Sequence, residues 1–598
     1  MFKKLLIANR GEIAVRIIQA CRELDIIPVA IFSEPDRESR HVKLAGETWK
    51  LEGPPNQVYL DASQILELAQ KAGAEAIHPG YGFLAENGQF AEDCTRAGIT
   101  FVGPAPDVIR QMGSKVHSRQ VMEKAGVPVV PGTIDPVTDP EKVKEIASRF
   151  GYPIAIKASA GGGGRGLRVV RNDNEVETAL AGAQREGASY FGSPEVYVEK
   201  YLDKPRHIEV QVLGDNHGNV IHLYERDCSS QRRHQKLLEE TPAAKLDPQV
   251  KEKLLEAAVR GTRALGYTSA GTLEFLVSGE DFYFLEMNTR VQVEHPITEM
   301  TTGVDIVKEQ ILIASGEKLS VSQEDIAQRG HSIECRINAE DPDKNFMPNP
   351  GTISDYVEPQ HPFSRVDSAS YPGYQVLPFY DSLLAKLVVW GRNRPEAIQR
   401  MRLALNDFVI EGVKTTIPFH QALLDDPTYQ AGEVHTAYVE KEMMPGWKDI
   451  KVRSEKKNIN ASRGSTLKSV GTNGESSGAR TYEVEVDQKV FKVQVTELVP
   501  AGAETGETAG TRTPARRAAR SARSKPGASG EITSSMHGLV KELLVKKGDQ
   551  VKSGQRLIVF EAMKMESDIV ADMDGTVGDI KVKVGQTVER DSLLLTIA

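Results

Sequence analysis

Short apolar runs alternate with amphipathic stretches along the first part of the chain. Residues 3–8 (KKLLIA) form one such run, and an amphipathic stretch extends from there to about residue 23. Further apolar runs follow at residues 26–32 and 74–82, the latter ending in a turn. Strand-length runs that alternate with helix-length stretches are typical of an open α/β sheet. We therefore predict such a sheet over residues 1–115.

A glycine-rich stretch separates two predicted strands in the next segment. Residues 152–170 (YPIAIKASAGGGGRGLRVV) predict a strand, a loop and a strand, and the loop contains Gly161, Gly162, Gly163 and Gly164. Glycine lets backbone N–H groups approach phosphate oxygens closely, and Lys157 at the end of the first strand could add a cation. No Walker-type GK[ST] follows, so a flexible structural loop explains these glycines about as well.

Polar and apolar residues alternate along residues 282–296 (FYFLEMNTRVQVEHP). This period of two predicts a strand across residues 282–290, with the side chains of Glu286, Asn288 and Arg290 on one face. A solvated strand face is the alternative interpretation of such alternation.

The segment GTLEFLV, which also has the pattern of a strand, and residues 282–296 together predict a possible metal site. The carboxylate of GTLEFLV, Glu274, can join Glu286 and Asn288, and carboxylate and amide oxygens are hard ligands suited to Mg²⁺ beside a nucleotide. Gln292 and Glu294 continue the polar series. The segment therefore predicts metal ligands, then an anion-binding arginine, then a potential base.

Two weaker signals lie between these motifs. In RRHQKLLEE (residues 232–240), His234, Gln235 and Lys236 could reach a terminal phosphate, although such basic clusters usually lie on the surface. In PRHIEVQV, His207 alternates with a glutamate and could equally be a structural histidine. Cys228 has no obvious partner and is interpreted as structural.

The mixed α/β pattern ends near residue 447, and the rest of the chain is modular. Residues 447–480 are polar and indicate a linker, residues 481–497 alternate as in a β-hairpin, and residues 498–530 are rich in Ala, Pro and Arg. Five arginines of that second linker could contact an acidic partner, although a solvated linker is favoured. Residues 531–598 repeat internally with a spacing of 37 positions, as between Gly538 and Gly575. Two similar β-rich halves predict a small two-fold sandwich with Lys564 at the turn between them.

Composition narrows the function classes. The net charge of −9 does not mark a nucleic-acid binder, and no apolar run of about 18 residues predicts a membrane span. The four scattered cysteines fit reduced thiols better than disulfides or a zinc site. The N-terminal segment lacks the apolar core of a signal peptide, so we expect a cytoplasmic enzyme.

Several motifs together resemble a known family. YPIAIKASAGGGGRG with FLEMNTRVQVEHP resembles the ATP-grasp signatures of the biotin carboxylase and carbamoyl-phosphate synthetase group. LLIANRGEIAVRI, HPGYGFLAEN, RRHQKLLEE and ECRINAEDP narrow this to biotin carboxylase, and EAMKMES resembles the biotin-attachment sequence of carrier domains. The resemblance implies an α/β and α+β fold: a Rossmann-like N-terminal domain, an ATP-grasp domain at 116–330 with a lid at about 131–202, a C-terminal domain at 331–446, and an all-β biotinyl/lipoyl-type sandwich at 531–598.

The resemblance also implies roles for individual residues. ATP would phosphorylate bicarbonate to carboxyphosphate, which delivers CO₂ to biotin. Glu294 matches the general base, and Arg336 matches the cation that stabilises the biotin enolate. Bicarbonate would bind Arg290, Gln292 and Val293, and Mg²⁺ (or Mn²⁺) would bind Glu274, Glu286 and Asn288. Residues matching ATP contacts are Lys115, Lys157, Gly161, Gly162, Gly163, Gly164, Glu199, Lys200, Tyr201, Leu202, His207, His234 and Lys236. Biotin would be attached to Lys564.

The implied partners are a biotin protein ligase and a separate carboxyltransferase (β) subunit, because the chain is similar to the α subunits of bacterial acyl-CoA carboxylases. The acceptor would be acetyl-CoA or propionyl-CoA, as in fatty acid biosynthesis, with pyruvate or urea as the alternative. A homo-oligomer through the biotin carboxylase region is also implied. Many such α subunits carry a substantial docking domain, whereas residues 448–530 hold only linkers and one predicted hairpin. That hairpin is a candidate for a reduced docking element or for pairing with the carrier.

Two other function classes stay open from the residues. A scaffold with an inactive ATP site is opposed by the retained acidic and basic motif residues, and a lipoyl carrier is opposed by the MKM sequence around Lys564.

Overall fold

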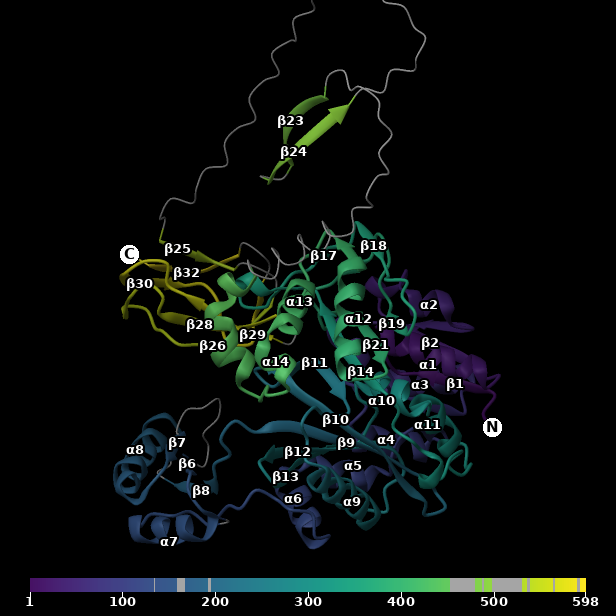
Figure 1. The fold of residues 1–598 in the computed structure, drawn as a ribbon, viewed down its shortest axis with the longest axis horizontal. Helices are drawn as coiled ribbons and strands as arrows, with labels where there is room; N and C mark the ends of the chain where they lie inside the picture. Colours follow the sequence, from purple (N-terminus) through teal and green to yellow (C-terminus); the bar gives the residue numbers. More distant parts are fainter. Residues whose placement is uncertain are drawn as a thin grey trace, which may run out of the picture. The chain divides into compact units, whose positions relative to one another are not determined.

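The structure is a computed structural model that describes residues 1–133, 135–158, 167–191, 195–451, 479–486, 489–496, 530–534, 538–562, 565–588 and 592–597. Figure 1 labels the elements on the ribbon and colours the chain from the N-terminus (purple) to the C-terminus (yellow). The predicted glycine loop, Lys564 and nearly all of both linkers lie outside the described residues. None of the helices among the described residues is both long and apolar enough to cross a membrane.

The N-terminal domain is a five-stranded parallel sheet with strand order β3-β2-β1-β4-β5. The strands are β1 (Lys4–Ile7), β2 (Ile27–Phe32), β3 (Glu47–Lys50), β4 (Ala76–His78) and β5 (Thr100–Phe101). Helices α1 (Gly11–Glu23), α3 (Ala62–Ala72) and α4 (Gly88–Arg96) connect them.

Both faces of this sheet are buried. Leu5 and Ile7 of β1 share a core cluster with Ile13 of α1, whereas Leu6 belongs to the opposite cluster with Ile65 of α3. Burial on both faces explains why the strands appear as continuous apolar runs in the sequence.

An eight-stranded antiparallel sheet with the order β13-β12-β9-β10-β11-β14-β21-β19 follows. Its strands are β9 (Arg206–Gly214), β10 (Val220–Arg232), β11 (Gln235–Thr241), β12 (Ser269–Ser278), β13 (Asp281–Asn288), β14 (His331–Asn338), β19 (Ser364–Ser368) and β21 (Leu383–Gly391). Because β11 pairs with β14, one hydrogen-bonded sheet crosses the boundary predicted at residue 330.

Helices cover the two faces of this sheet differently. Ile333 and Cys335 of β14 share a core cluster with Met401 of α12 (Arg394–Asp407). The alternate side chains of β14, including Arg336, turn to the other face, where α10 (His295–Thr302) contacts β14 and β21. Helix α9 (Pro248–Ala264) contacts β9 and β10. The polar face of β14 thus lies against the start of α10.

A small sheet with the order β7-β6-β8 lies within residues 131–202, the segment for which the sequence predicts a lid. Its strands are β6 (Ile154–Ala158), β7 (Leu167–Val170) and β8 (Val196–Lys200), and its helices are α7 (Pro140–Phe150) and α8 (Asp173–Phe191). Ile154, Ile156 and Val198 share a core of their own with residues of α7 and α8. This segment therefore has a hydrophobic core separate from that of the large sheet.

An antiparallel strand pair lies where the sequence predicts a hairpin. Strands β23 (Ala479–Val486) and β24 (Lys489–Thr496) pair from Ala479–Thr496 to Val486–Lys489, and the two residues between them lie outside the described part of the chain. This pair belongs to a compact unit of its own.

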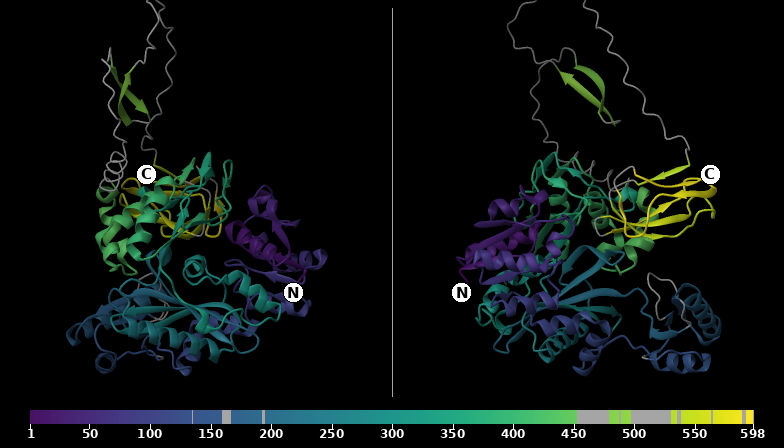
Figure 2. Two further views of the ribbon diagram at one scale, coloured as in Figure 1. Left: turned by 45° about the vertical axis from the view of Figure 1, so that its right-hand side comes forward. Right: turned by 180° about the vertical axis from the view of Figure 1, so that it is seen from behind.

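The C-terminal domain is a sandwich of two four-stranded sheets, drawn in yellow in Figures 1 and 2. The sheet orders are β25-β32-β30-β27 and β29-β28-β26-β31. The strands are β25 (Glu531–Thr533), β26 (Gly538–Leu543), β27 (Gln550–Val551), β28 (Arg556–Ala562), β29 (Met565–Val570), β30 (Gly575–Ile580), β31 (Thr587–Val588) and β32 (Leu593–Ile597). Strands β26, β27 and β28 recur 37 positions later as β30, β31 and β32, which confirms the predicted two-fold sandwich.

Candidate active site

A cavity of about 1320 Å³ gathers the predicted site residues. Its wall contains every predicted catalytic, ATP, bicarbonate and metal residue among the described residues: Lys115, Lys157, Glu199, Lys200, Tyr201, Leu202, His207, His234, Lys236, Glu274, Glu286, Asn288, Arg290, Gln292, Val293, Glu294 and Arg336. The N-terminal domain contributes Asn9, Glu12 and Tyr81 to the same wall. Residues spread over more than 300 positions of sequence therefore line one space.

A β-bulge sets the direction of the predicted metal ligands. Strict alternation would place Glu286 on the same face as Phe282 and Phe284, which are buried in the core. The pairing of β12 with β13 shifts between Glu274–Glu286 and Phe275–Phe284, which leaves Leu285 as the extra residue, 40% exposed. The bulge reverses the phase of the strand, so Glu286 and Asn288 line the cavity.

The strand that carries these ligands is also shorter than the sequence predicts. Alternation predicts a strand to residue 290, but β13 ends at Asn288, and the following residues lead into α10. The backbone N–H of Thr289 and the guanidinium of Arg290 both donate to Glu86. These residues therefore bond to the N-terminal domain and do not continue the pairing with β12. The prediction of one strand face carrying all of these groups is therefore wrong, although they do meet in one cavity.

The carboxylates of Glu274 and Glu286 face each other across the paired strands β12 and β13. Glu274 Oε1 accepts hydrogen bonds from Asn288 Nδ2 at 2.9 Å and from Gln292 Nε2 at 2.8 Å. Burial, followed by the nearby charge of Glu274, raises the pKa of Glu286. Two opposed carboxylates and an amide oxygen are a donor set that a divalent cation would satisfy.

Lys236 joins three buried carboxylates. Its Nζ lies 2.5 Å from Glu209 Oε2, 2.9 Å from Glu274 Oε1 and 2.5 Å from Glu294 Oε1. Burial would raise the pKa of Glu274, but the charges of Lys236 and His207 outweigh it and lower that pKa. The lysine is thus fixed between the metal ligands and the potential base.

Glu294 is the residue immediately before α10 and is only 1% exposed. Its Oε2 accepts from Arg336 Nη2 at 2.9 Å. Burial would raise its pKa, but the charges of Lys236, Arg336 and Arg226 lower the pKa well below the usual range. The carboxylate is therefore ionised, and it lies at the cavity among cations.

The other end of the cavity carries the lid residues. Lys157 on β6 forms an ion pair with Glu199 on β8. The backbone N–H of Tyr201 donates to Pro153 O at 3.0 Å, and Lys200 Nζ donates to Gly151 O at 3.0 Å. These bonds fix residues 199–202 as a connection between the small sheet β7-β6-β8 and β9.

Comparisons with known proteins identify the domains. The biotin carboxylase N-terminal domain matches residues 1–109, the ATP-binding domain of the carbamoyl-phosphate synthase L chain matches residues 114–322, and the biotin carboxylase C-terminal domain matches residues 334–441. A domain described as that of a biotin-requiring enzyme matches residues 528–597.

Two curated relatives are more than half identical to the matched region. A pyruvate carboxylase subunit of Methanothermobacter thermautotrophicus is 55% identical over 442 residues, which are 74% of this chain and 90% of the relative. Biotin carboxylase 1 of Bacillus subtilis is 54% identical over 444 residues, which are 74% of this chain and 98% of the relative. The chain belongs to the biotin carboxylase family.

A solved structure is similar to this biotin carboxylase. The biotin carboxylase domain dimer of 2-oxoglutarate carboxylase from Hydrogenobacter thermophilus, in complex with MgADP, ADP and bicarbonate, has a TM-score of 0.66 and 52% identity. The match covers 75% of this chain and 98% of that chain. The comparisons confirm the predicted fold class and the fusion to a biotin domain, and they support biotin, ATP and Mg²⁺ as cofactors.

Three further residues of this biotin carboxylase hold the predicted ones and were not identified from the sequence. Glu86 accepts from Arg290 Nε at 3.0 Å, Lys386 Nζ donates to Val293 O at 3.0 Å, and Glu239 Oε1 accepts from Arg336 Nε at 2.6 Å. Two of these had a signal: Glu86 lies in HPGYGFLAEN, and Lys386 interrupts the apolar run LLAKLVVW. Glu239 likewise lies in a motif, RRHQKLLEE, but nothing there distinguishes it from the neighbouring Glu240.

Cys228, which was predicted to be structural, is a buried free cysteine with a neighbour that the sequence does not reveal. Its Sγ lies 3.9 Å from Glu294 Oε1, so the thiol does have a partner. Burial raises the pKa of Cys228 well above its usual value, so the thiol is neutral and donates only weakly.

Proposed function

We propose that this biotin carboxylase carries out a two-step carboxylation of biotin on its own carrier domain. The proposal rests on one cavity that contains opposed carboxylates, a lysine and a buried ionised carboxylate. In the first step, a bicarbonate oxygen attacks the γ-phosphorus of ATP, the bond to ADP breaks, and Glu294 takes the bicarbonate proton. The product is carboxyphosphate. Catalysis of such transfers depends mostly on positioning and charge neutralisation.

The residues divide by role along the cavity. Glu274, Glu286 and Asn288 would hold Mg²⁺, which when bound neutralises phosphate charge. Nucleotide phosphates would contact Lys115, Lys157 and Lys236, with the glycines Gly161, Gly162, Gly163 and Gly164, while His207, His234, Glu199, Lys200, Tyr201 and Leu202 would complete the ATP site. Bicarbonate would bind Arg290, Gln292 and Val293.

In the second step, the C–O bond of carboxyphosphate to the phosphate group breaks and gives CO₂ and phosphate. The phosphate takes the N1′ proton of the biotin attached to Lys564, and the resulting biotin enolate bonds to CO₂ through N1′. Arg336 would offset the negative charge of the biotin enolate without changing its own protonation state. The whole reaction is tested by measuring ATP cleavage with and without bicarbonate, using free biotin as acceptor. ATP cleavage that does not depend on bicarbonate would contradict the proposal and favour a scaffold with an inactive site.

We further propose that the carboxyl group is delivered to an acyl-CoA, such as acetyl-CoA or propionyl-CoA, by a separate carboxyltransferase subunit. The fusion of biotin carboxylase to carrier, as in the acyl-CoA carboxylase α subunits that the chain resembles, supports this acceptor. Relatives named as pyruvate and 2-oxoglutarate carboxylase subunits support a 2-oxo acid as the second candidate. Mass-spectrometric identification of the partner that co-purifies with the native protein separates the two.

The chain alone is expected to carboxylate no acyl-CoA. A transferase needs a CoA pocket and an oxyanion-stabilising site, and these require a domain-sized core that two linkers and a hairpin do not supply. With ATP, Mg²⁺ and labelled bicarbonate, the biotinylated chain should accumulate label on its carrier and transfer it only after a partner is added. Labelled product formed by the rigorously purified chain would show that it holds a transferase site of its own.

Residues 498–530, of which only residue 530 lies within the described part, are expected to act as a swinging tether. As a flexible coil these 33 residues would span roughly 30–35 Å, with a ceiling of about 110 Å when extended. Deleting about 20 residues should slow carboxylation of the carrier and acceptor but spare carboxylation of free biotin. Unchanged overall activity would assign the movement to residues 448–480 or to whole-domain motion.

A further inference from the structure

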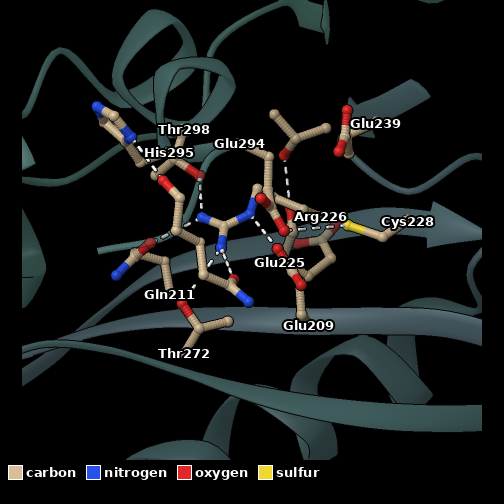
Figure 3. Close-up of polar contacts among 12 residues, drawn as sticks. Glu209, Gln211, Glu225, Arg226, Cys228, Glu239, Thr272, Glu294, His295 and Thr298 are labelled. Atoms are coloured by element: carbon tan, nitrogen blue, oxygen red, sulfur yellow. Dashed lines mark hydrogen bonds and ion pairs between the residues drawn. The ribbon is translucent and has the colours of Figure 1, made fainter. Parts of the chain in front are cut away.

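A buried arginine, Arg226, contacts residues that line the cavity but does not itself line it. Arg226 on β10 is 0% exposed and is among the largest fully buried side chains of the described residues. Figure 3 shows its guanidinium among polar side chains from several elements. None of the roles proposed above uses it.

Arg226 directs all five of its N–H donors to protein acceptors. Nε donates to Glu209 Oε1 at 2.5 Å. Nη1 donates to Gln211 Oε1 at 2.8 Å and to Thr298 Oγ1 at 3.1 Å. Nη2 donates to Thr272 Oγ1 at 3.2 Å and to Gln292 Oε1 at 2.8 Å. A guanidinium has five donors in a rigid fork, so this set is saturated and its geometry is fixed.

The contact with Gln292 decides which end of that amide faces the cavity. A guanidinium can only donate, so the amide oxygen of Gln292 must point toward Arg226. The amide nitrogen then points the other way, where one N–H reaches Glu274 Oε1 at 2.8 Å. Its second N–H is the group left to meet an anion in the cavity. With the amide reversed, an oxygen would face that anion instead.

Arg226 also contacts residues that hold Lys236 and Glu294, the cation and the base beside that anion. Glu209 accepts from Arg226 through Oε1 and from Lys236 through Oε2, so it links the two cations. Thr298 lies on α10, one turn after Glu294, so the bond from Nη1 anchors the helix that presents the base. One side chain thereby connects β9, β12, the segment before α10 and α10 itself.

We propose that Arg226 is a positioning residue for bicarbonate: it fixes the amide of Gln292 with its N–H donors toward the anion. The inference rests on the bicarbonate role proposed for Gln292. A lysine at this position keeps the positive charge but lacks the fork, so it cannot hold Glu209 and Gln292 together.

The test is steady-state kinetics of bicarbonate-dependent ATP cleavage by the full chain. Arg226→Lys is expected to raise KM for bicarbonate at least about tenfold, because a hydrogen bond to a charged ligand is lost. KM for ATP should change much less. In a Gln292→Ala background, Arg226→Lys should add little to KM for bicarbonate, because residues that act through one contact are not additive. Independent, multiplying effects would overturn the inference.

A control variant separates positioning of Gln292 from a general loss of structure around Arg226. Thr272→Val removes one bond to Nη2 but leaves the bond to Gln292, so it should keep the wild-type KM for bicarbonate. Equal losses in Thr272→Val and Arg226→Lys would reduce Arg226 to a structural role.

Gln292→Glu covers the case in which Arg226→Lys does not fold. It still accepts from Arg226 but offers the anion no donor, so KM for bicarbonate should rise as in Gln292→Ala. A wild-type KM for bicarbonate in Gln292→Glu would overturn the inference. Wild-type protein without bicarbonate-dependent ATP cleavage would instead refute the proposed function.

Discussion

Replacing Glu294 with alanine is expected to lower bicarbonate-dependent ATP cleavage by roughly 10²–10⁴-fold, the usual contribution of a positioned base. The carboxylate is buried and held by Lys236 Nζ at 2.5 Å and Arg336 Nη2 at 2.9 Å, so its direction is fixed. Its lowered pKa keeps it ionised at neutral pH, in the form that accepts a proton. ATP binding should largely persist, because Lys157 and Glu199 pair with each other and Lys236 keeps its ion pairs with Glu209 and Glu274.

The measurement is ATP turnover at saturating bicarbonate, together with nucleotide affinity by equilibrium binding. Glu239→Ala is the matched control, since Glu239 is the other carboxylate that pairs with Arg336 but does not line the cavity. Burial, partly offset by Arg336, raises the pKa of Glu239 to about 7. Its loss should cost much less activity than the loss of Glu294. Turnover near wild type in Glu294→Ala would refute the base, and lost nucleotide binding would make Glu294 a structural residue or a metal ligand.

Replacing Lys564 with alanine is expected to abolish biotin incorporation completely. Biotin would be attached to the ε-amine of this lysine, and alanine offers no nucleophile in its place. Strands β28 and β29 pair as far as Ala562 and Met565, so Lys564 falls in the two-residue connection, which lies outside the described residues.

Streptavidin blotting and intact mass of the C-terminal domain measure the outcome. Lys583→Ala is the control, because it removes an exposed lysine from the same domain and should leave the signal unchanged. A streptavidin signal that persists in Lys564→Ala would place the attachment elsewhere. An added mass equal to lipoate rather than biotin would favour the lipoyl alternative.

The sequence predicted which elements form and which residues belong to the site, but it predicted less well how those residues are arranged. Apolar runs and amphipathic stretches located the first two strands and α1 within a residue or two, because burial of both sheet faces leaves a strong local pattern. The family motifs named residues that do meet in one cavity. The 37-residue repeat predicted a sandwich, since each half alone exposes an apolar face.

The missed features depend on contacts that are distant in sequence. The bulge at Leu285 comes from pairing with β12, so strict alternation along a single strand gives the wrong phase. The end of β13 depends on Glu86, about 200 positions away. Arg226 belongs to none of the sequence motifs, and only its five acceptors on other elements show what it holds.

The two halves of the carrier exchange strands. The first half supplies β26 and β28 to one sheet but β27 to the other. The second half supplies β30 and β32 to the sheet of β27, but its β31 joins the sheet of β26 and β28. Each sheet contains strands from both halves, so neither half can form a complete sheet until both have been synthesised. The domain should therefore fold as one cooperative unit, and a nascent chain that ends between the halves should remain unfolded. If the ligase recognises only the folded domain, biotin would be attached only to chains that have been synthesised to the end of the domain. Truncated translation products would contain the acceptor lysine but would not be biotinylated.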